Sequence, residues 1–212
     1  MPARPALLLL IALGACAPRD AAPPPRDEAA DALLAHVTGD AFDEAFAALD
    51  ALPHRVRRQS ARNGGGHSSE DRSDSTGVAA ANPLGAFLSD EPPYLDAAAR
   101  DQYAVAVVGD TLVAGRRAPL VEARYREASG RAQPIQYVRA AVADGRLLHV
   151  HVRRSSESLL YDEQSWLTAS LQAAPGGALV PAAAQAITET DVPLSPPRAH
   201  TVAWEVSLGA AP

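Results

Sequence analysis

Residues 135–153 read IQYVRAAVADGRLLHVHVR, and this stretch decides the fold. Asp144-Gly145 lies between two runs in which apolar and polar side chains alternate, and an Asp-Gly pair supplies the positive φ angles of a type I′ turn. One face carries Val138, Ala140, Val142, Leu148, Val150 and Val152, and the other carries His149, His151 and Arg153. The pattern predicts an antiparallel hairpin that is covered on one face.

Similar alternation continues along the chain on both sides of this hairpin. Further strands are expected at residues 103–108, 120–126, 159–162, 166–171 and 201–208, with a polar edge strand at 54–61. Residues 110–116 form a short excursion, and Pro175-Gly176-Gly177 marks a turn. The chain therefore predicts an antiparallel meander of about seven strands, with one face covered and the other wet or lining a cavity.

Two helical patterns come before the strands. The first covers residues 27–39, and its acidic start suits a helix N-terminus. The second repeats Phe42, Phe46 and Leu49 at helical spacing. In the interpretation that we favour, this apolar stripe packs on the protein's own sheet; in the alternative it binds a partner.

Residues 62–77 break the periodicity. They read RNGGGHSSEDRSDSTG and contain no large apolar side chain. This composition is typical of a flexible loop. Apart from that predicted loop, residues 27–212 are expected to form a single domain.

The first residues have the pattern of an export signal, with Arg4 before a short apolar run and small residues after it. Leu13-Gly14-Ala15-Cys16 resembles the lipobox of bacterial lipoproteins. The resemblance implies that residues 1–15 are removed and that Cys16 carries a diacylglycerol and an N-acyl chain of the palmitate kind. Residues 16–26 then form a proline-rich tether. The alternative is a plain signal peptide that happens to contain a cysteine.

Three chains on Cys16 would give a membrane anchor with negligible release, because each buried CH₂ contributes about 0.8 kcal/mol. Ala17, in place of an aspartate, favours the outer membrane and a domain that faces the periplasm. Cys16 is the only cysteine, so lipidation leaves no thiol for a disulfide or a metal site.

Composition and motifs argue against several classes of function. A net charge of −6 is unsuited to a nucleic-acid surface. The chain has no lysine and therefore no Walker A motif, and it has no Gly-x-Ser-x-Gly elbow. His149 and His151 point the same way on one strand and could share a metal, but no third ligand is evident, so a solvent-facing pair is favoured. We expect no enzyme activity, no metal site and no cofactor other than the lipid.

A family resemblance lies in residues 100–155. Its motifs are Tyr103-x-Val-x-Val-Val-Gly-Asp-x-Leu-Val-Ala-Gly-Arg116, Val121-Glu122-x-Arg124, Gln136-Tyr-Val-Arg139 and Asp144-Gly-Arg-Leu147. Together they resemble the outer-membrane lipoprotein carrier and receptor superfamily and its periplasmic stress-sensor relatives. The resemblance implies an α+β fold, in which N-terminal helices pack on a curved antiparallel β-sheet that forms an open half-barrel. It also implies apolar cavities for acyl chains rather than catalytic residues.

The function expected from these observations is non-catalytic binding of a lipid or of lipoprotein acyl chains by a membrane-anchored envelope protein. The alternative is an envelope sensor or assembly partner that binds other proteins through its sheet face. Two apolar stripes are candidates for a binding groove, one packing on the helices and the other lining the groove: Val121, Ala123 and Tyr125, and Val202, Trp204 and Val206.

Overall fold

The computed structural model describes residues 27–37, 41–64, 67–76, 94–126, 134–158 and 160–209. Side chains of residues 41–43 and 67–76 are outside this description, so the side chain of Phe42 is too. The predicted signal segment, the predicted lipidation site Cys16 and the predicted tether at 16–26 also lie outside the described residues.

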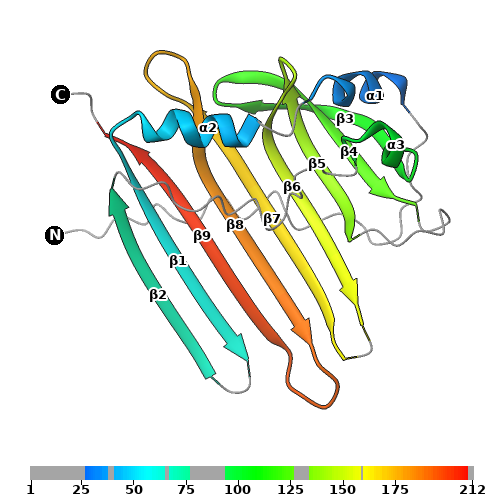
Figure 1. The fold of residues 1–212 in the computed structure, drawn as a ribbon, viewed down its shortest axis with the longest axis vertical. Helices are drawn as coiled ribbons and strands as arrows, with labels where there is room; N and C mark the ends of the chain where they lie inside the picture. The colour runs from blue at the N-terminus through cyan, green and yellow to red at the C-terminus, as the bar shows by residue number, and fades with distance from the viewer. Residues whose placement is uncertain are drawn as a thin grey trace.

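The described chain contains helices and strands in an order close to the predicted one (Figure 1). The helices are α1 (Glu28–Ala35), α2 (Ala41–Asp50) and α3 (Ala97–Arg100). The strands are β1 (His54–Gly64), β2 (His67–Thr76), β3 (Tyr103–Val113), β4 (Arg116–Tyr125), β5 (Ile135–Ala143), β6 (Arg146–Glu157), β7 (Asp162–Ala173), β8 (Leu179–Asp191) and β9 (Arg198–Leu208).

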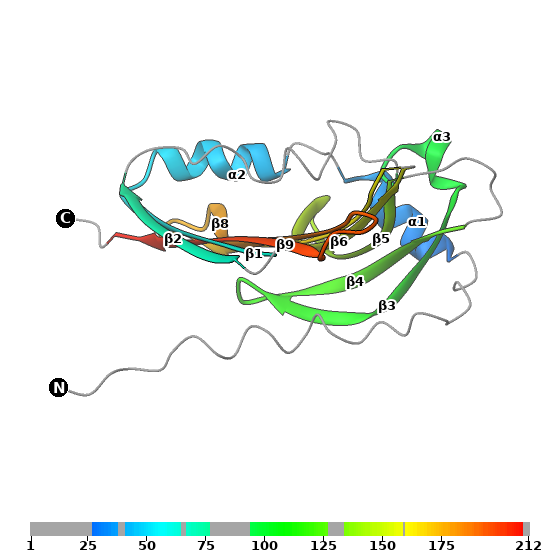
Figure 2. The same cartoon turned by 90° about the horizontal axis from the view of Figure 1, so that it is seen from below.

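All nine strands join one antiparallel sheet in the order β2-β1-β9-β8-β7-β6-β5-β4-β3. The sheet is open, because β2 and β3 end it without pairing to each other. It is also strongly curved, and β3 and β4 turn well out of the plane of β1 and β9 (Figure 2). The predicted fold class, an open antiparallel sheet with a few N-terminal helices, is confirmed at this level. None of the helices in the described ranges has the length and apolar character needed to cross a membrane.

The central hairpin is confirmed, except that a register shift after Ala141 pairs Val142 with Leu147 in place of Leu148. Asp144 and Gly145 have φ angles of 53° and 69°, as the Asp-Gly turn requires. Val138 pairs with Val152 on the facing strand. Gly145 also lies close to the end of α1, since a Cβ atom added there would come within 2.9 Å of the His36 carbonyl oxygen. Glycine is therefore required at this turn for its backbone angle and for space.

Residues that pair directly from strand to strand form one row of side chains across the sheet. We call the face on which this row lies the inner face. This row runs Ala123, Val138, Val152, Leu167, Ala186, Val202 and Ser60. The first six are buried and belong to the core, and Ser60 is half-buried at the far end. Helices α1 and α2 add Ala30, Leu34 and Ala45 to the main core, and Leu49 to a smaller one. Burial of each large apolar side chain contributes about 1.5–3 kcal/mol.

Helix α1 begins against the edge strand β3. The Asp27 N–H donates to the Val105 carbonyl oxygen at 3.0 Å, and the Val107 N–H donates to the Asp27 carboxylate at 3.1 Å. The Asp27 carboxylate also caps the helix by accepting from the Ala29 N–H at 2.9 Å. These bonds satisfy part of an edge that would otherwise present unpaired backbone groups.

The predicted loop at 62–77 is wrong in its secondary structure. Strands β1 and β2 form a hairpin there, with ten residue pairs from Arg55–Thr76 to Gly64–His67. Consequently β1 is an interior strand between β2 and β9, and β2 is the edge. The composition rule failed because a ladder of backbone hydrogen bonds can form between strands whose sequences are polar on both faces.

Two other strand predictions need correction. β8 was missed, because its alanine-rich sequence LVPAAAQAITETD shows no alternation of large and polar side chains. The strand predicted at 166–171 is part of the longer strand β7, whereas the strand predicted at 159–162 is wrong, because Leu160 and Tyr161 lie between β6 and β7. The excursion at 110–116 is the end of β3, a tight turn and the start of β4. Pro181 is tolerated inside β8 because it pairs with Leu171 at a register shift in the ladder.

Candidate functional site

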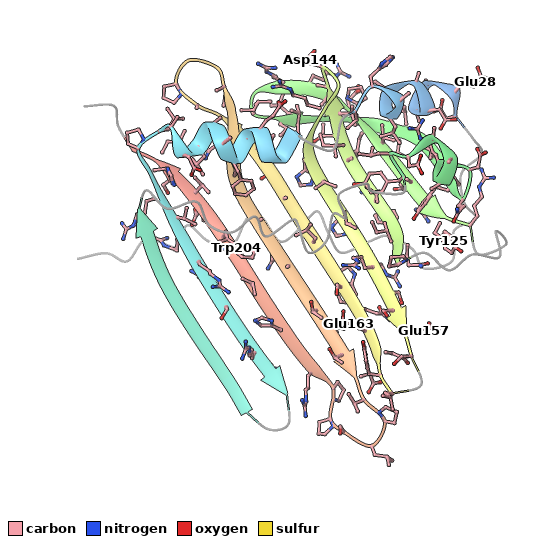
Figure 3. All side chains as sticks on the ribbon, in the orientation of Figure 1. Glu28, Tyr125, Asp144, Glu157, Glu163 and Trp204 are labelled. Atoms are coloured by element: carbon pink, nitrogen blue, oxygen red, sulfur yellow. The ribbon has the colours of Figure 1, made fainter. Side chains whose placement is uncertain are left out.

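The two apolar stripes predicted as groove candidates lie on the same face of the sheet. Ala123 and Val202 occupy one cross-sheet row, and Val121 and Trp204 occupy the next. Tyr125 and Trp204 lie far apart across the strands of this sheet (Figure 3). The expectation that one stripe faces the helices and the other faces a separate groove therefore does not describe the arrangement.

The first stripe is part of the main core. Val121 and Ala123 are each 2% exposed, and Tyr125 packs beside them with its ring 5.8 Å from that of Tyr103. Side chains at this depth contact a ligand only if the core opens. A binding role for this stripe stays a prediction.

The second stripe is less enclosed. Val202 is buried, whereas Trp204 and Val206 are half-buried. Val206 packs against the small core around Leu49 of α2. The guanidinium of Arg58 lies 5.8 Å above the Trp204 ring, in a cation–π contact. A binding role for this stripe is likewise a prediction.

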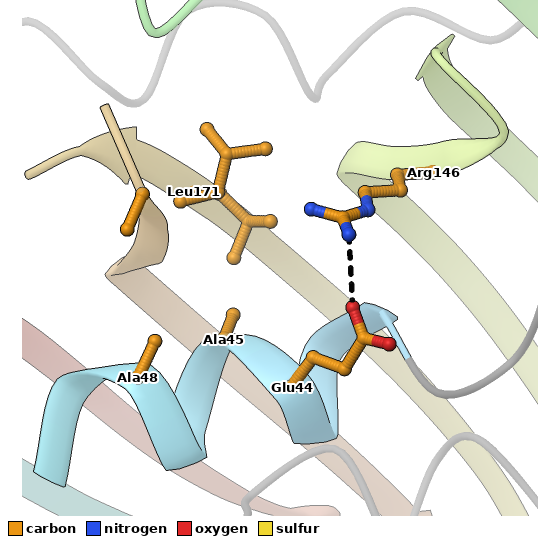
Figure 4. A pocket seen from close by; sticks show the side chains of 7 residues that line it. Glu44, Ala45, Ala48, Arg146 and Leu171 are labelled. Carbon is orange, nitrogen blue, oxygen red and sulfur yellow. Dashed lines mark ion pairs between the residues drawn. The ribbon is translucent and has the colours of Figure 1, made fainter. Parts of the chain in front are cut away.

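A pocket of about 180 Å³ lies between α2 and the ends of the strands (Figure 4). It is lined by Glu44, Ala45, Ala48, Arg146, Leu171, Ala178 and Leu179. Arg146 and Glu44 form an ion pair at 3.2 Å across it. Pockets for drug-sized ligands usually measure about 300–1,000 Å³, so this pocket is small for an acyl chain.

The opposite face of β4–β7 has a different character, and we call it the arginine face. Its residues are Glu122, Arg124, Tyr137, Arg139, His149, His151, Arg153, Trp166 and Thr168. The register aligns them in cross-strand rows, with Glu122, Arg139, His151 and Thr168 in one and Arg124, Tyr137, Arg153 and Trp166 in the next. Apart from buried Glu122, they are all half-buried, so the face is polar and partly open.

Glu122 is the centre of a hydrogen-bond network on this face. Its Oε1 accepts from Arg124 Nε at 2.6 Å, and its Oε2 accepts from Tyr137 Oη at 2.8 Å and Arg139 Nη2 at 2.9 Å. Burial acts to raise the pKa of Glu122, but the bonds from Arg139, Tyr137 and Arg124 outweigh it and hold the pKa below its usual range. Burial and the bond to Glu122 raise the pKa of Tyr137 to about 12.

The two histidines of β6 lie beside this network. His151 Nδ1 is 3.0 Å from Thr168 Oγ1, and its ring meets that of Tyr137 edge-on at 6.0 Å. Burial lowers the pKa of His151, with a further contribution from Arg139, and burial and His151 lower the pKa of His149. Within the described residues, no group of three or more His, Cys, Asp and Glu side chains is placed to hold a metal ion.

Sequence reasoning placed these polar residues on strand faces but did not bring them together. The alternation already put Glu122 and Arg124 on one face of their strand, and His149, His151 and Arg153 on one face of theirs. The available signal was the polar side of the same alternation that located the core. Only the pairing register shows that these faces adjoin.

No protein-family model matches this chain, and no curated protein matches it. Solved structures give weak similarities. A DUF1329 family protein from Desulfovibrio piger is 11% identical, with 86% of this chain and 94% of that chain covered and a TM-score of 0.30.

MucB in complex with MucA(peri) is 10% identical, with 86% of this chain and 95% of that chain covered and a TM-score of 0.25. The Pseudomonas aeruginosa MucA/MucB complex is also 10% identical, with 82% and 100% covered and a TM-score of 0.22. TM-scores this low carry no argument about the fold or function of this chain.

Proposed function

We propose that this chain is a lipid-anchored protein of the bacterial envelope that binds another protein through its sheet and catalyses no reaction. The observation that carries the proposal is the arginine face, where half-buried Tyr137, Arg139, Arg153 and Trp166 lie side by side on adjacent strands. Arginine, tyrosine and tryptophan are the side chains most enriched at the energetic centres of protein interfaces.

The inner face supports protein binding over acyl-chain binding. Its apolar rows between β4 and β7 are filled by the protein's own side chains, among which Val150, Val152 and Leu167 are 0% exposed. Its continuation on β1 is polar, with Arg58 exposed and Ser60 half-buried. The pocket beside α2 is smaller than ligand pockets usually are.

A second candidate, contact with lipid, is favoured by apolar side chains at one end of the sheet. Leu160 and Tyr161, between β6 and β7, are 75% and 41% exposed, and Leu194, between β8 and β9, is fully exposed with a φ of 65°. Exposed apolar side chains on a turn can enter a bilayer surface or cover an acyl chain. However, Glu157, Asp162 and Asp191 pair in one row beside these turns, and their charges oppose approach to an anionic membrane.

The lipid anchor is tested first. The full-length chain, expressed in a bacterium with lipoprotein processing, should give an intact mass equal to residues 16–212 plus a diacylglycerol and one acyl chain. Cys16→Ser should remain unprocessed and lack these chains. An intact mass with a free thiol at Cys16 would contradict the anchor.

The binding function is tested with the same full-length chain in the source bacterium. A photo-crosslinking amino acid at Trp166 should give one discrete protein adduct, and the same amino acid at Arg198, on the other face, should not. The purified protein is titrated in parallel with a fluorescent acyl-chain probe. Saturable binding of the acyl-chain probe, together with no adduct from position 166, would indicate that the protein binds lipid and not another protein.

A further inference from the structure

The arginine face carries more positive charge than its own carboxylate can neutralise. Its two rows contain Arg124, Arg139 and Arg153, and Glu122 is their one carboxylate. These two rows are therefore locally cationic on a chain whose net charge is −6, whereas the same face carries Glu189 and the acidic row Glu157, Asp162 and Asp191 closer to the β6–β7 turn. A local field opposite in sign to the whole molecule favours a specific anionic partner over general attraction to polyanions.

Glu122 is one carboxylate among three arginines, so part of the positive charge of these rows has no negative partner within them. Arg124, Tyr137 and Arg139 already donate to both of its oxygens. The Nε atoms of Arg139 and Arg153 are buried without an acceptor. Leaving such a donor unpaired costs about 1–3 kcal/mol, and more for a charged group, so an acceptor that reaches these atoms once the arginine side chains turn outward would recover that free energy.

The positions of these two arginines fit a carboxylate-bearing segment. Tyr137 faces Arg153 directly, and Arg139 is the neighbour of Tyr137 two residues along β5. A guanidinium binds a carboxylate through two parallel N–H groups, which gives the contact a defined orientation. Trp166 and Ile187 continue the row of Arg153 and are half-buried, so an apolar side chain next to the acid would also find a contact.

We infer that the arginine face binds an acidic segment of the partner protein, with Arg139 and Arg153 as the contacts for its carboxylates. This inference rests on the proposed function, because it names the chemistry of the partner at the same surface. The indole of Trp166 packs beside the segment and excludes water from the ion pairs, which strengthens them.

The probe is a fluorescein-labelled hexaglutamate peptide, titrated at low salt into the full-length chain in neutral detergent. It should bind saturably, more weakly as salt rises, and hexaglutamine should not bind. Arg153→Gln should weaken hexaglutamate binding at least tenfold. The matched control is Arg198→Gln, which removes the same charge from an exposed position on the other face and should change affinity less than twofold.

Three results overturn the inference. The first is unchanged binding by Arg153→Gln, and the second is an equal loss with Arg198→Gln, which would indicate general electrostatics. The third is displacement of the probe by pyrophosphate at concentrations below those of unlabelled hexaglutamate, which would indicate a phosphate site. A melting curve of each variant separates loss of binding from loss of fold, and Arg153→Lys, which keeps the charge, should recover part of the affinity.

Crosslinking from Trp166 separates this inference from the proposed function. If the adduct from the crosslinker at position 166 persists unchanged when Arg153→Gln is added, protein binding stands and the acidic segment is wrong. If the crosslinker at position 166 gives no adduct in a chain that keeps Arg153, but hexaglutamate binds through Arg153, the acid site stands and protein binding fails.

Discussion

Strands β6 and β1 belong to the same sheet and differ in length by one residue, yet beyond buried Val56 the inward side chains of β1 differ in burial from those of β6. Val150 and Val152 of β6 are 0% exposed, whereas Arg58 and Ser60, at the same cross-sheet rows on β1, are exposed and half-buried. β6 is held by backbone pairing and by the core, while β1 relies mainly on pairing with β2 and β9. Membership of the sheet and membership of the core are therefore separate properties, and stability should fall from one strand to the other.

The largest expected effect is a charge placed on the inner face of β6. Val150→Asp would bury an unpaired carboxylate and should lower the free energy of unfolding by about 4 kcal/mol or more. Ser60→Asp on β1 should lower it by about 1 kcal/mol at most, because Ser60 is half-buried and a carboxylate there keeps part of its contact with water. Urea unfolding of the full-length chain measures both. Equal losses would show that the two strands do not differ as described.

A smaller effect is expected at the turn that joins β5 and β6. Gly145→Ala should lower the free energy of unfolding by about 1–3 kcal/mol, because the new Cβ combines a positive φ with contact to the His36 carbonyl oxygen. Gly115→Ala is the matched control, since its φ of 74° is similar and nothing lies within 4 Å of the added Cβ. If both variants melt together, the contact with α1 adds nothing to the backbone strain.

Hydrogen exchange compares the two regions without a mutation. Amide protons of β1 that pair with β2 should exchange at least tenfold faster than those of β6 that pair with β7, because β2 forms the edge of the sheet. The mobility expected at 62–77 stays a prediction, and this measurement tests it as easy opening of the β1–β2 pair. Mass spectrometry of exchanged peptides gives the rates, and equal protection in both strands would contradict it.

The smallest effect is a pH dependence of stability that comes from the two histidines of β6. Burial lowers the pKa values of His149 and His151 below their ordinary 6.5, so the unfolded chain takes up protons there more readily than the folded one. Stability should be full above this value and should fall as the pH drops below it. The melting temperature should thus decrease by a few degrees between pH 7.5 and 5.5.

The matched variant replaces both histidines with glutamine, and it should show a shallower decrease over the same pH range. An identical slope in the wild type and the double variant would assign the pH dependence to other groups. Binding of an acidic segment beside His151 would oppose the decrease, because a nearby carboxylate favours the protonated imidazole.

The sequence alone was sufficient wherever one face of a local segment is buried. It located the Asp144-Gly145 hairpin, both N-terminal helices and the strand from Arg198 to Leu208 in outline, because burial of one face imposes a period on the chain. It was insufficient for β2 and β8. The first is polar on both faces, and the second is built from small side chains, so neither shows a period.

The tertiary structure alone decided which faces adjoin. The two apolar stripes share one face, and Glu122, Arg139 and Arg153 meet on the other, although they come from three strands. The register also shifts within the pairings β3–β4, β5–β6 and β7–β8, and each shift changes which positions face the same way. Sequence patterning fixes the two sides of each strand, whereas pairing across the sheet determines which of those sides become one surface.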